Sequence, residues 1–180
     1  MRKKLLTILT LLWMVFIFFM SSAGQETSDG QSDAVCDLIG SIFVEDYEDL
    51  PPEEKAEWQD RITFPVRKGA HMTEYAILGA LLALTACEYL SAGKDGGPGE
   101  KDAERTERAP YAAALAAGFL YAASDEFHQR FVPGRSGELR DVLIDTAGVL
   151  IGICIVWALK KHRRNSRLAR ESCAPDAGCP

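Results

Sequence analysis

The chain has 180 residues, 47% of them hydrophobic, and a formal net charge of −6 at pH 7. This length is enough for one domain, and so acidic a chain argues against nucleic acid as a partner. The mean hydropathy is close to zero, which is low for a membrane protein, but polar and apolar residues lie in separate blocks. Twelve acids and one base lie between Glu26 and Asp60, and six bases and no acid lie between Lys160 and Arg170. Such blocks are typical of solvated segments, and the runs between them are long, apolar and nearly uncharged.

The five cysteines predict neither a disulfide framework nor a metal site. Cys36 lies in the acidic segment, Cys87 and Cys154 lie in apolar runs, and Cys173 and Cys179 lie in the tail. No CxxC spacing occurs, so we expect no zinc site made of cysteines. Because no nucleotide-binding motif is present either, we expect no cofactor.

Residues 1–23 are predicted to form the first transmembrane helix. The segment begins with three bases and continues as an apolar run. Ser21-Ser22-Ala23 would suit a signal peptidase, so a cleaved signal peptide is the alternative. Trp13 and the phenylalanines that follow it favour a retained helix with one end at the membrane interface.

Residues 24–66 are predicted to form an acidic extracytoplasmic loop. We expect it to be flexible, with one amphipathic piece around Leu38–Val44. A short helix is expected at Pro51–Trp58, because proline and acids favour the first turn of a helix.

Residues 67–160 form the predicted membrane core, with three helices and one polar loop. The helices are expected at Gly69–Leu90, at Pro110–Ala123 with an extension through Phe127, and at Asp141–Leu159, and the loop at 91–108. The first of these has about the length needed to cross a bilayer, and the second is marginal. Together with residues 1–23, they predict an all-α fold, a polytopic membrane bundle of four transmembrane helices.

The distribution of bases predicts the orientation of these helices. With the amino terminus inside, three bases at the start, four in residues 91–108 and six in the tail face the cytoplasm, against seven outside. The positive-inside rule therefore places both termini in the cytoplasm. The basic tail, residues 161–180, is expected to be disordered there.

This orientation brings three polar motifs, distant in the sequence, to the outer membrane–water boundary. The predicted outer-face polar site consists of Lys68, His71, Glu74, Tyr75, Ser124, Asp125, Glu126, His128, Gln129, Arg135, Asp141 and Asp145. Carboxylates are costly in an apolar environment, so ionisable residues inside a span usually serve a function.

Helical spacing and residue type predict several contacts. Asp141 and Asp145 share one helical face with Gly148 and Gly152, and that face should pack closely on a neighbour. Asp145 needs a partner or a proton. His71 is the preferred partner, and Lys68 and Arg135 are the alternatives. In the third helix, the small residues Ala113, Ala117 and Gly118 are predicted to face neighbouring helices.

Three blocks of the chain resemble the VanZ-like family of bacterial integral membrane proteins. They are WMVFIFFMSS at Trp13–Ser22, FPVRKGAHMTEYAILG at Phe64–Gly79 and SDEFHQRFVPGRSGELRDVLIDTAGVLIG at Ser124–Gly152. The resemblance covers most of Leu5–Lys160. It weakens after the serines, where Ala23-Gly24 stands in place of the family's Gln-Pro-Gly.

The resemblance implies a multi-pass protein of the bacterial cytoplasmic membrane whose first helix is retained. The family's founding member contributes to low-level resistance to the glycopeptide teicoplanin by an unknown mechanism. Some relatives carry a phosphotransbutyrylase label, but this chain has no soluble acyl-transfer domain that would bind coenzyme A.

The first interpretation of the outer-face site is recognition of a cell-envelope component, either an anionic lipid headgroup or a cell-wall precursor. Four bases supply donors for phosphate or carboxylate: Arg67, Lys68, Arg135 and Arg140. The alternative is that these bases only reach toward lipid headgroups and fasten the loops.

The second interpretation is a membrane-embedded enzyme that uses a histidine and carboxylate cluster. The general acid or base types are His71, Asp125, Glu126, His128, Asp141 and Asp145. The pairs His71/Glu74 and Asp125/His128 have a spacing that metal ligands sometimes have, but most such pairs in helices belong to structural hydrogen-bond networks. No catalytic residue or metal ligand is assigned.

The third interpretation is a structural membrane partner protein without catalysis, in which the polar cluster fastens the four helices together. A soluble helical protein with the apolar runs in its core is a further alternative. The bases that flank every apolar run count against it.

Overall fold

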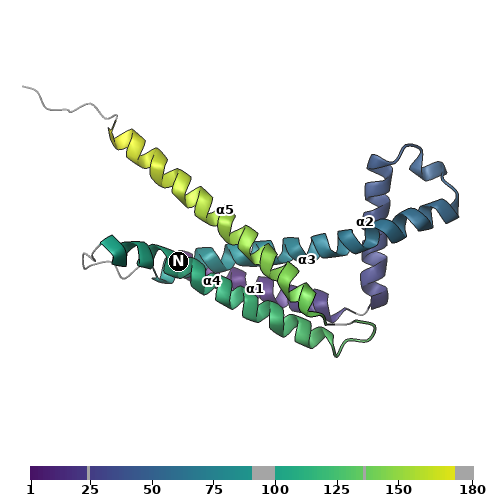
Figure 1. The fold of residues 1–180 in the computed structure, drawn as a ribbon, viewed down its shortest axis with the longest axis horizontal. Coiled ribbons are helices and arrows are strands. Elements are labelled where there is room, and N and C mark those ends of the chain that lie inside the picture. The colour runs from purple at the N-terminus through teal and green to yellow at the C-terminus, as the bar shows by residue number, and fades with distance from the viewer. Residues whose placement is uncertain (24, 91–99, 136, 173–180) are drawn as a thin grey trace, which may run out of the picture.

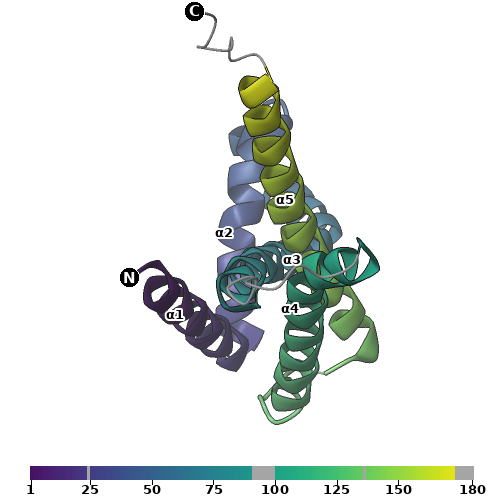
Figure 2. The same ribbon diagram turned by 90° about the vertical axis from the view of Figure 1, so that its left-hand side faces the viewer.

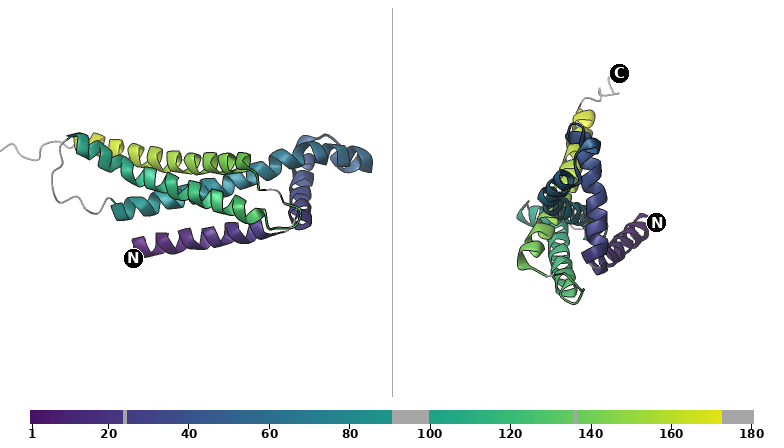
Figure 3. Two further views of the ribbon diagram at one scale, coloured as in Figure 1. Left: turned by 60° about the horizontal axis from the view of Figure 1, so that its bottom comes forward. Right: turned by 90° about the vertical axis from the view of Figure 1, so that its right-hand side faces the viewer.

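The computed structural model describes residues 1–23, 25–90, 100–135 and 137–172. These residues form helices and no strands: α1 (Arg2–Ser22), α2 (Gln25–Phe43), a 3-10 turn η1 (Tyr47–Asp49), α3 (Pro52–Leu90), α4 (Glu100–Gln129) and α5 (Leu139–Ser172). α1, α3, α4 and α5 run along one long direction, and α2 stands across one end of the bundle (Figures 1 and 3). α1 packs on α3 and α4, and α5 packs on the same two helices (Figure 2). The prediction of an all-α fold is confirmed.

α3 and α5 approach each other closely. A Cβ atom on Gly152 would lie 1.9 Å from the carbonyl oxygen of Ala76, and one on Gly148 would lie 2.4 Å from that of Met72. Only glycine leaves room for backbones this close. The predicted shared face is therefore correct, because the two glycines lie against α3 and Asp141 bonds to Lys68 of α3.

The segment predicted as a flexible loop, residues 24–66, is mostly helical. α2 fills its first half, and α3 begins at Pro52 and continues without interruption through Pro65. Side chains hold α2 against η1 and α3, because Asp37 of α2 accepts from Tyr47 Oη of η1 (2.7 Å) and from Gln59 Nε2 of α3 (2.7 Å). The expectation of a flexible loop was wrong because these tertiary contacts stabilise an acidic helix of low hydrophobicity.

α4 begins at Glu100, so part of the predicted loop 91–108 is helical, and residues 91–99 lie outside the described residues. The packed face of α4 includes Ala114, Gly118 and Ala122, all buried. A Cβ atom on Gly118 would lie 2.6 Å from a methyl group of Val149. The prediction was right for Gly118 and wrong for Ala113 and Ala117, which are exposed.

The tail predicted to be disordered is helical as far as Ser172, as a continuation of α5, and residues 173–180 lie outside the described residues. Arg164 donates to Glu107 of α4 over 2.5 Å, which ties this extension to the start of α4. The extension follows from a run of helix-forming residues without glycine or proline between Gly152 and Pro175.

Among the described helices, three are long and apolar enough to cross a membrane: α1, α3 and, within α5, Leu139–Arg167. Large apolar side chains of α1 point outward, with Leu12 and Phe19 among the exposed ones, as lipid-facing residues do. α4 is not one of the three, so the count of four spans stays a prediction.

Candidate functional site

The turn between α4 and α5 lies at the end of the bundle where α1 ends and α2 crosses (Figure 3). Pro133 and Gly134 occupy its two central positions, and the Arg135 amide donates to the Val132 carbonyl over 3.1 Å. Gly134 has φ 79°, which is the geometry of a Pro-Gly type II turn. The turn holds Arg135 back toward the helices, where its side chain is half-buried.

Asp125 of α4 is the acceptor that joins three helices at this end. Its Oδ2 atom accepts from Ser21 of α1 (2.7 Å), from Tyr75 of α3 (3.2 Å) and from Gln129 one turn along α4 (3.2 Å). The carboxyl is 3% exposed. Buried carboxylates are stable only when they are hydrogen-bonded, so Asp125 serves to hold α1 and α3 against α4.

His128 also faces α1. Its Nε2 lies 3.1 Å from the Ser22 hydroxyl, and its ring lies 4.7 Å from that of Phe18. Ser124 is exposed and donates to the carbonyl of Tyr121 in its own helix. His128 and Ser124 therefore make structural contacts, and neither lines a cavity described below.

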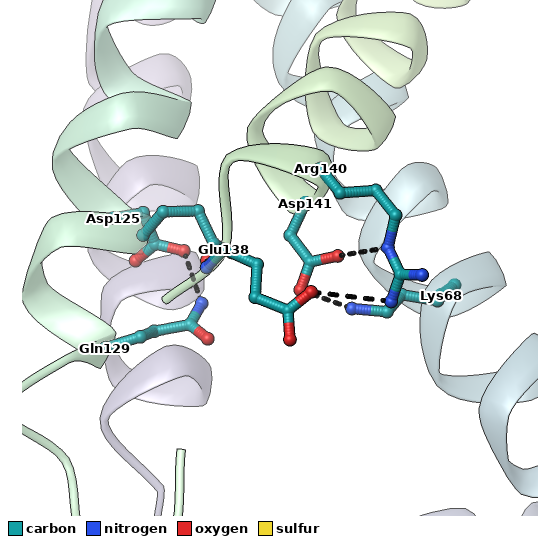
Figure 4. Close-up of polar contacts among 7 residues, drawn as sticks. Lys68, Asp125, Gln129, Glu138, Arg140 and Asp141 are labelled. Atoms are coloured by element: carbon teal, nitrogen blue, oxygen red, sulfur yellow. Dashed lines mark hydrogen bonds and ion pairs between the residues drawn. The ribbon is translucent and has the colours of Figure 1, made fainter. Parts of the chain in front are cut away.

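Lys68 of α3 pairs with Asp141 at the start of α5 (Figure 4). Arg140 approaches the same region, 3.5 Å from Glu138 and 4.0 Å from Asp141. Figure 4 also shows Asp125 and Gln129 in contact on the α4 side. Polar residues of α3 and α5 that are distant in the sequence are therefore in contact.

Glu126 fastens the turn to α4. Its carboxylate accepts from the Glu138 backbone amide over 3.1 Å, and the side chain is buried. A Cβ atom on Gly137 would lie 2.1 Å from the Glu126 carbonyl oxygen. Glycine at this position lets the chain pass close enough for the bond to form.

These contacts enclose a cavity of about 250 Å³, which we name the polar cavity. It is lined by Phe64, Arg67, Lys68, His71, Glu126, Gln129, Gly134, Arg135, Glu138, Arg140, Asp141, Ile144 and Asp145. Seven of the twelve predicted site residues lie in its wall. Tyr75, Ser124, Asp125 and His128 do not, and Glu74 faces a second cavity.

Asp145 is the most deeply placed acid of the polar cavity, at 2% exposure, and its Oδ2 has no hydrogen-bond partner within the described chain. The Nδ1 atom of His71 also has none. The predicted pair of His71 and Asp145 does not form: both residues line the cavity, but no hydrogen bond or ion pair joins them. The predicted alternative, Lys68, is taken by Asp141.

Arg135 makes no side-chain hydrogen bond or ion pair with any described residue. Burial lowers the pKa of its guanidinium, and repulsion from Arg67 lowers it further, against the opposite effects of Asp125, Glu126 and Glu74. The two guanidinium groups therefore repel each other at the cavity wall. An anion placed between them would relieve this repulsion and accept bidentate hydrogen bonds.

A second cavity, which sequence reasoning missed, lies beside the first. We name it the apolar cavity. It has a volume of about 410 Å³ and is lined by Met20, Ser32, Val35, Ile39, Pro65, Val66, Arg67, Gly69, Ala70, His71, Thr73, Glu74 and Arg135. α2 supplies one wall, so the cavity could not be inferred while residues 24–66 were taken as a loop. The four-residue spacing of Val35 and Ile39 was the available signal.

Groups of three or more His, Cys, Asp or Glu side chains that could hold a metal ion do not occur within the described residues.

Comparisons with known proteins give one match, to a family of proteins. A family model described as VanZ/LLP1 matches residues 6–160, which include most of α1, all of α2, α3 and α4, and the residues of the polar cavity. No curated protein and no solved structure matches the chain. Since the match covers most of the chain, this protein belongs to the VanZ/LLP1 family.

Proposed function

We propose that this protein recognises the anionic group of a cell-envelope component at the outer face of the bacterial cytoplasmic membrane. The observation that carries the proposal is the Arg135 guanidinium, which lies at the wall of the polar cavity beside Arg67 and makes no side-chain ion pair with a described residue. Arginine in a partly desolvated wall binds phosphate or carboxylate strongly, through charge-assisted hydrogen bonds.

The proposal includes an orientation. α4 serves as the fourth span, and both termini lie in the cytoplasm. The start of α1 and the end of α5 point toward the same end of the bundle in Figure 3, which fits an even number of crossings. The excess of bases in the two terminal segments favours that end as the cytoplasmic one. The polar cavity, near the end of α1 and the start of α5, then opens outward.

The test is thermal unfolding of the protein in a neutral detergent, with palmitoyl lysophosphatidylglycerol as the anionic probe and monopalmitoylglycerol as the neutral one. A ligand that binds only the folded state raises Tm by mass action. We expect the anionic probe to raise Tm and the neutral probe to leave it unchanged. Arg135→Gln should abolish this rise, whereas Arg130→Gln, which changes an exposed arginine in the same region, should preserve it. An equal rise for both variants would refute the proposal.

Membership of the family supports one cellular consequence, a link to glycopeptide sensitivity. We propose that cells expressing the protein tolerate more teicoplanin than cells lacking it, and that Arg135→Gln removes the difference while Arg130→Gln keeps it. The minimum inhibitory concentration measures this. Equal inhibition with and without the protein would remove the glycopeptide part of the proposal and leave the binding part to the thermal test.

A further inference from the structure

We infer that the ligand is a phospholipid whose hydrocarbon chain lies in the apolar cavity, whose phosphate meets Arg67 and Arg135, and whose headgroup donates hydrogen bonds into the polar cavity. This inference rests on the proposed function and specifies the class of ligand for the same site.

The two cavities are adjacent and follow the order of parts in a lipid. Arg67, His71 and Arg135 line both of them and therefore form their common wall. On one side of this wall lie apolar residues, among them Val35 and Ile39 of α2. A phosphate held at the common wall would have a hydrocarbon environment on one side and a polar one on the other. The volume of the apolar cavity, about 410 Å³, falls in the range of small-molecule sites, roughly 300–1,000 Å³.

The position of α2 explains how the hydrocarbon chain of a lipid would enter the apolar cavity from the membrane. The helix stands across the end of the bundle (Figure 1) and is amphipathic. Cys36 is buried and Ile39 half-buried toward α3, whereas Leu38, at 61% exposure, and Ile42 point away from it. Leu38 and Ile42 therefore give α2 an exposed apolar face, as a helix in the membrane interface has. The cavity between such a helix and a transmembrane helix borders the lipid phase. A hydrocarbon chain can therefore enter the cavity laterally from the bilayer.

The polar cavity determines the headgroup. Its acids are Glu126, Glu138, Asp141 and Asp145. They would repel a second anionic group deep in the cavity, so a single phosphate at the common wall fits best. The Asp145 carboxyl is nearly inaccessible and its Oδ2 is unpartnered, so it can accept from a hydroxyl or ammonium group of the ligand. Phosphatidylglycerol has such donors, and phosphatidylcholine has none in its headgroup.

The experiment uses the whole chain in phosphatidylcholine nanodiscs. The probe is palmitoyl lysophosphatidylglycerol that carries a photoactivatable diazirine in the middle of its chain. After irradiation, peptides from 32–39 and 65–74 should be labelled, and an excess of the unmodified probe should suppress the labelling. Glycerol 3-phosphate, which has the phosphate and hydroxyls but no chain, should suppress it only at a concentration at least about a hundredfold higher. The diazirine form of lysophosphatidylcholine should label these peptides at least about tenfold less.

Two matched variants test whether the hydrocarbon chain of the lipid lies in the apolar cavity. Ile39→Trp fills the apolar cavity and should weaken binding of the probe at least about tenfold, whereas Leu38→Trp adds the same ring on the exposed face of α2 and should leave binding unchanged. Labelling confined to other outward faces of the helices, or full affinity in Ile39→Trp, would overturn the inference. If Arg135→Gln still prevents binding in that case, the phosphate is recognised while its chain stays in the bilayer, and the proposed function survives. If Arg135→Gln also binds normally, both fail.

Discussion

Lys68 and Asp141 form an ion pair between α3 and α5 that makes up part of the wall of the polar cavity. Their side chains are 21% and 14% exposed, so the pair is largely withdrawn from water. Breaking such a pair leaves one charge without compensation, whereas removing both charges does not.

Lys68→Met should therefore lower the free energy of unfolding by up to about 3 kcal/mol, because it leaves the Asp141 carboxylate without its main partner. Arg140 lies 4.0 Å from that carboxylate and compensates its charge only partly. The double variant Lys68→Met/Asp141→Leu should be more stable than Lys68→Met alone, with a coupling energy of roughly 0.5–3 kcal/mol. Reversible unfolding in mixed micelles gives these values. The exposed pair of Arg61 and Glu57 is the control, and its loss should cost about 1 kcal/mol or less. Additive effects at Lys68 and Asp141 would contradict the pair.

Gly152→Ala should separate α3 from α5. Its new methyl group would lie 1.9 Å from the Ala76 carbonyl oxygen, and relieving such overlap costs about 1–3 kcal/mol. Gly69→Ala is the matched control, because a Cβ atom there meets nothing within 4 Å and alanine favours a helix by about 1 kcal/mol over glycine. Thermal unfolding in detergent should show a lower Tm for the first variant and an unchanged or higher Tm for the second. Equal Tm values would show that the helices are not in close contact.

Gly118→Leu tests the position of α4 in the bundle. A side chain there meets Val149 of α5, so the variant should yield less folded protein by size-exclusion chromatography. Ala117→Leu places the same side chain on the exposed face of α4 and should be tolerated. If Gly118→Leu is as well folded as Ala117→Leu, α4 does not pack on α5 as described.

Asp145→Asn separates a structural role from a binding role. The carboxyl is buried and its Oδ2 is without a hydrogen-bond partner, so an amide of the same shape should not lower Tm. It should weaken binding of palmitoyl lysophosphatidylglycerol several-fold, because the amide is a poorer acceptor. Unchanged binding in Asp145→Asn would leave the residue a packing role only.

Thiol labelling tests the orientation, and the structure changes the choice of probe. Cys36 is fully buried, with its Sγ 3.7 Å from the Thr63 hydroxyl, so it cannot report accessibility. Glu45→Cys in a Cys36→Ser background puts a thiol in an exposed turn. A membrane-impermeant reagent should label it in intact cells and should label Cys173 and Cys179 only after lysis. Labelling of the tail cysteines in intact cells, or recovery of protein without Met1–Ala23, would contradict the orientation.

The sequence predicts the part of the fold that charge and spacing encode. Asp145, Gly148 and Gly152 recur at helical intervals, so their common face could be inferred before any contact was known. The packed face of α4 could not, because an alanine-rich run has no hydrophobic periodicity to distinguish Ala113 from Ala114. Most of α2 was missed for a different reason: its polar residues and glycines outnumber its apolar residues, and its helical state depends on α3. Because the apolar cavity needs α2 as a wall, it could not be inferred while residues 24–66 were taken as a loop.

The most direct test of anion recognition is the Kd of palmitoyl lysophosphatidylglycerol, measured by calorimetry with the protein in phosphatidylcholine nanodiscs. The wild type and Arg130→Gln should bind with the same Kd. Arg135→Gln should raise Kd at least about tenfold, because a charge-assisted hydrogen bond contributes roughly 1.5–3 kcal/mol. Arg135→Lys should fall between them, since a lysine keeps the charge but not the bidentate geometry. The same Kd in all four proteins would contradict recognition of an anion at this cavity.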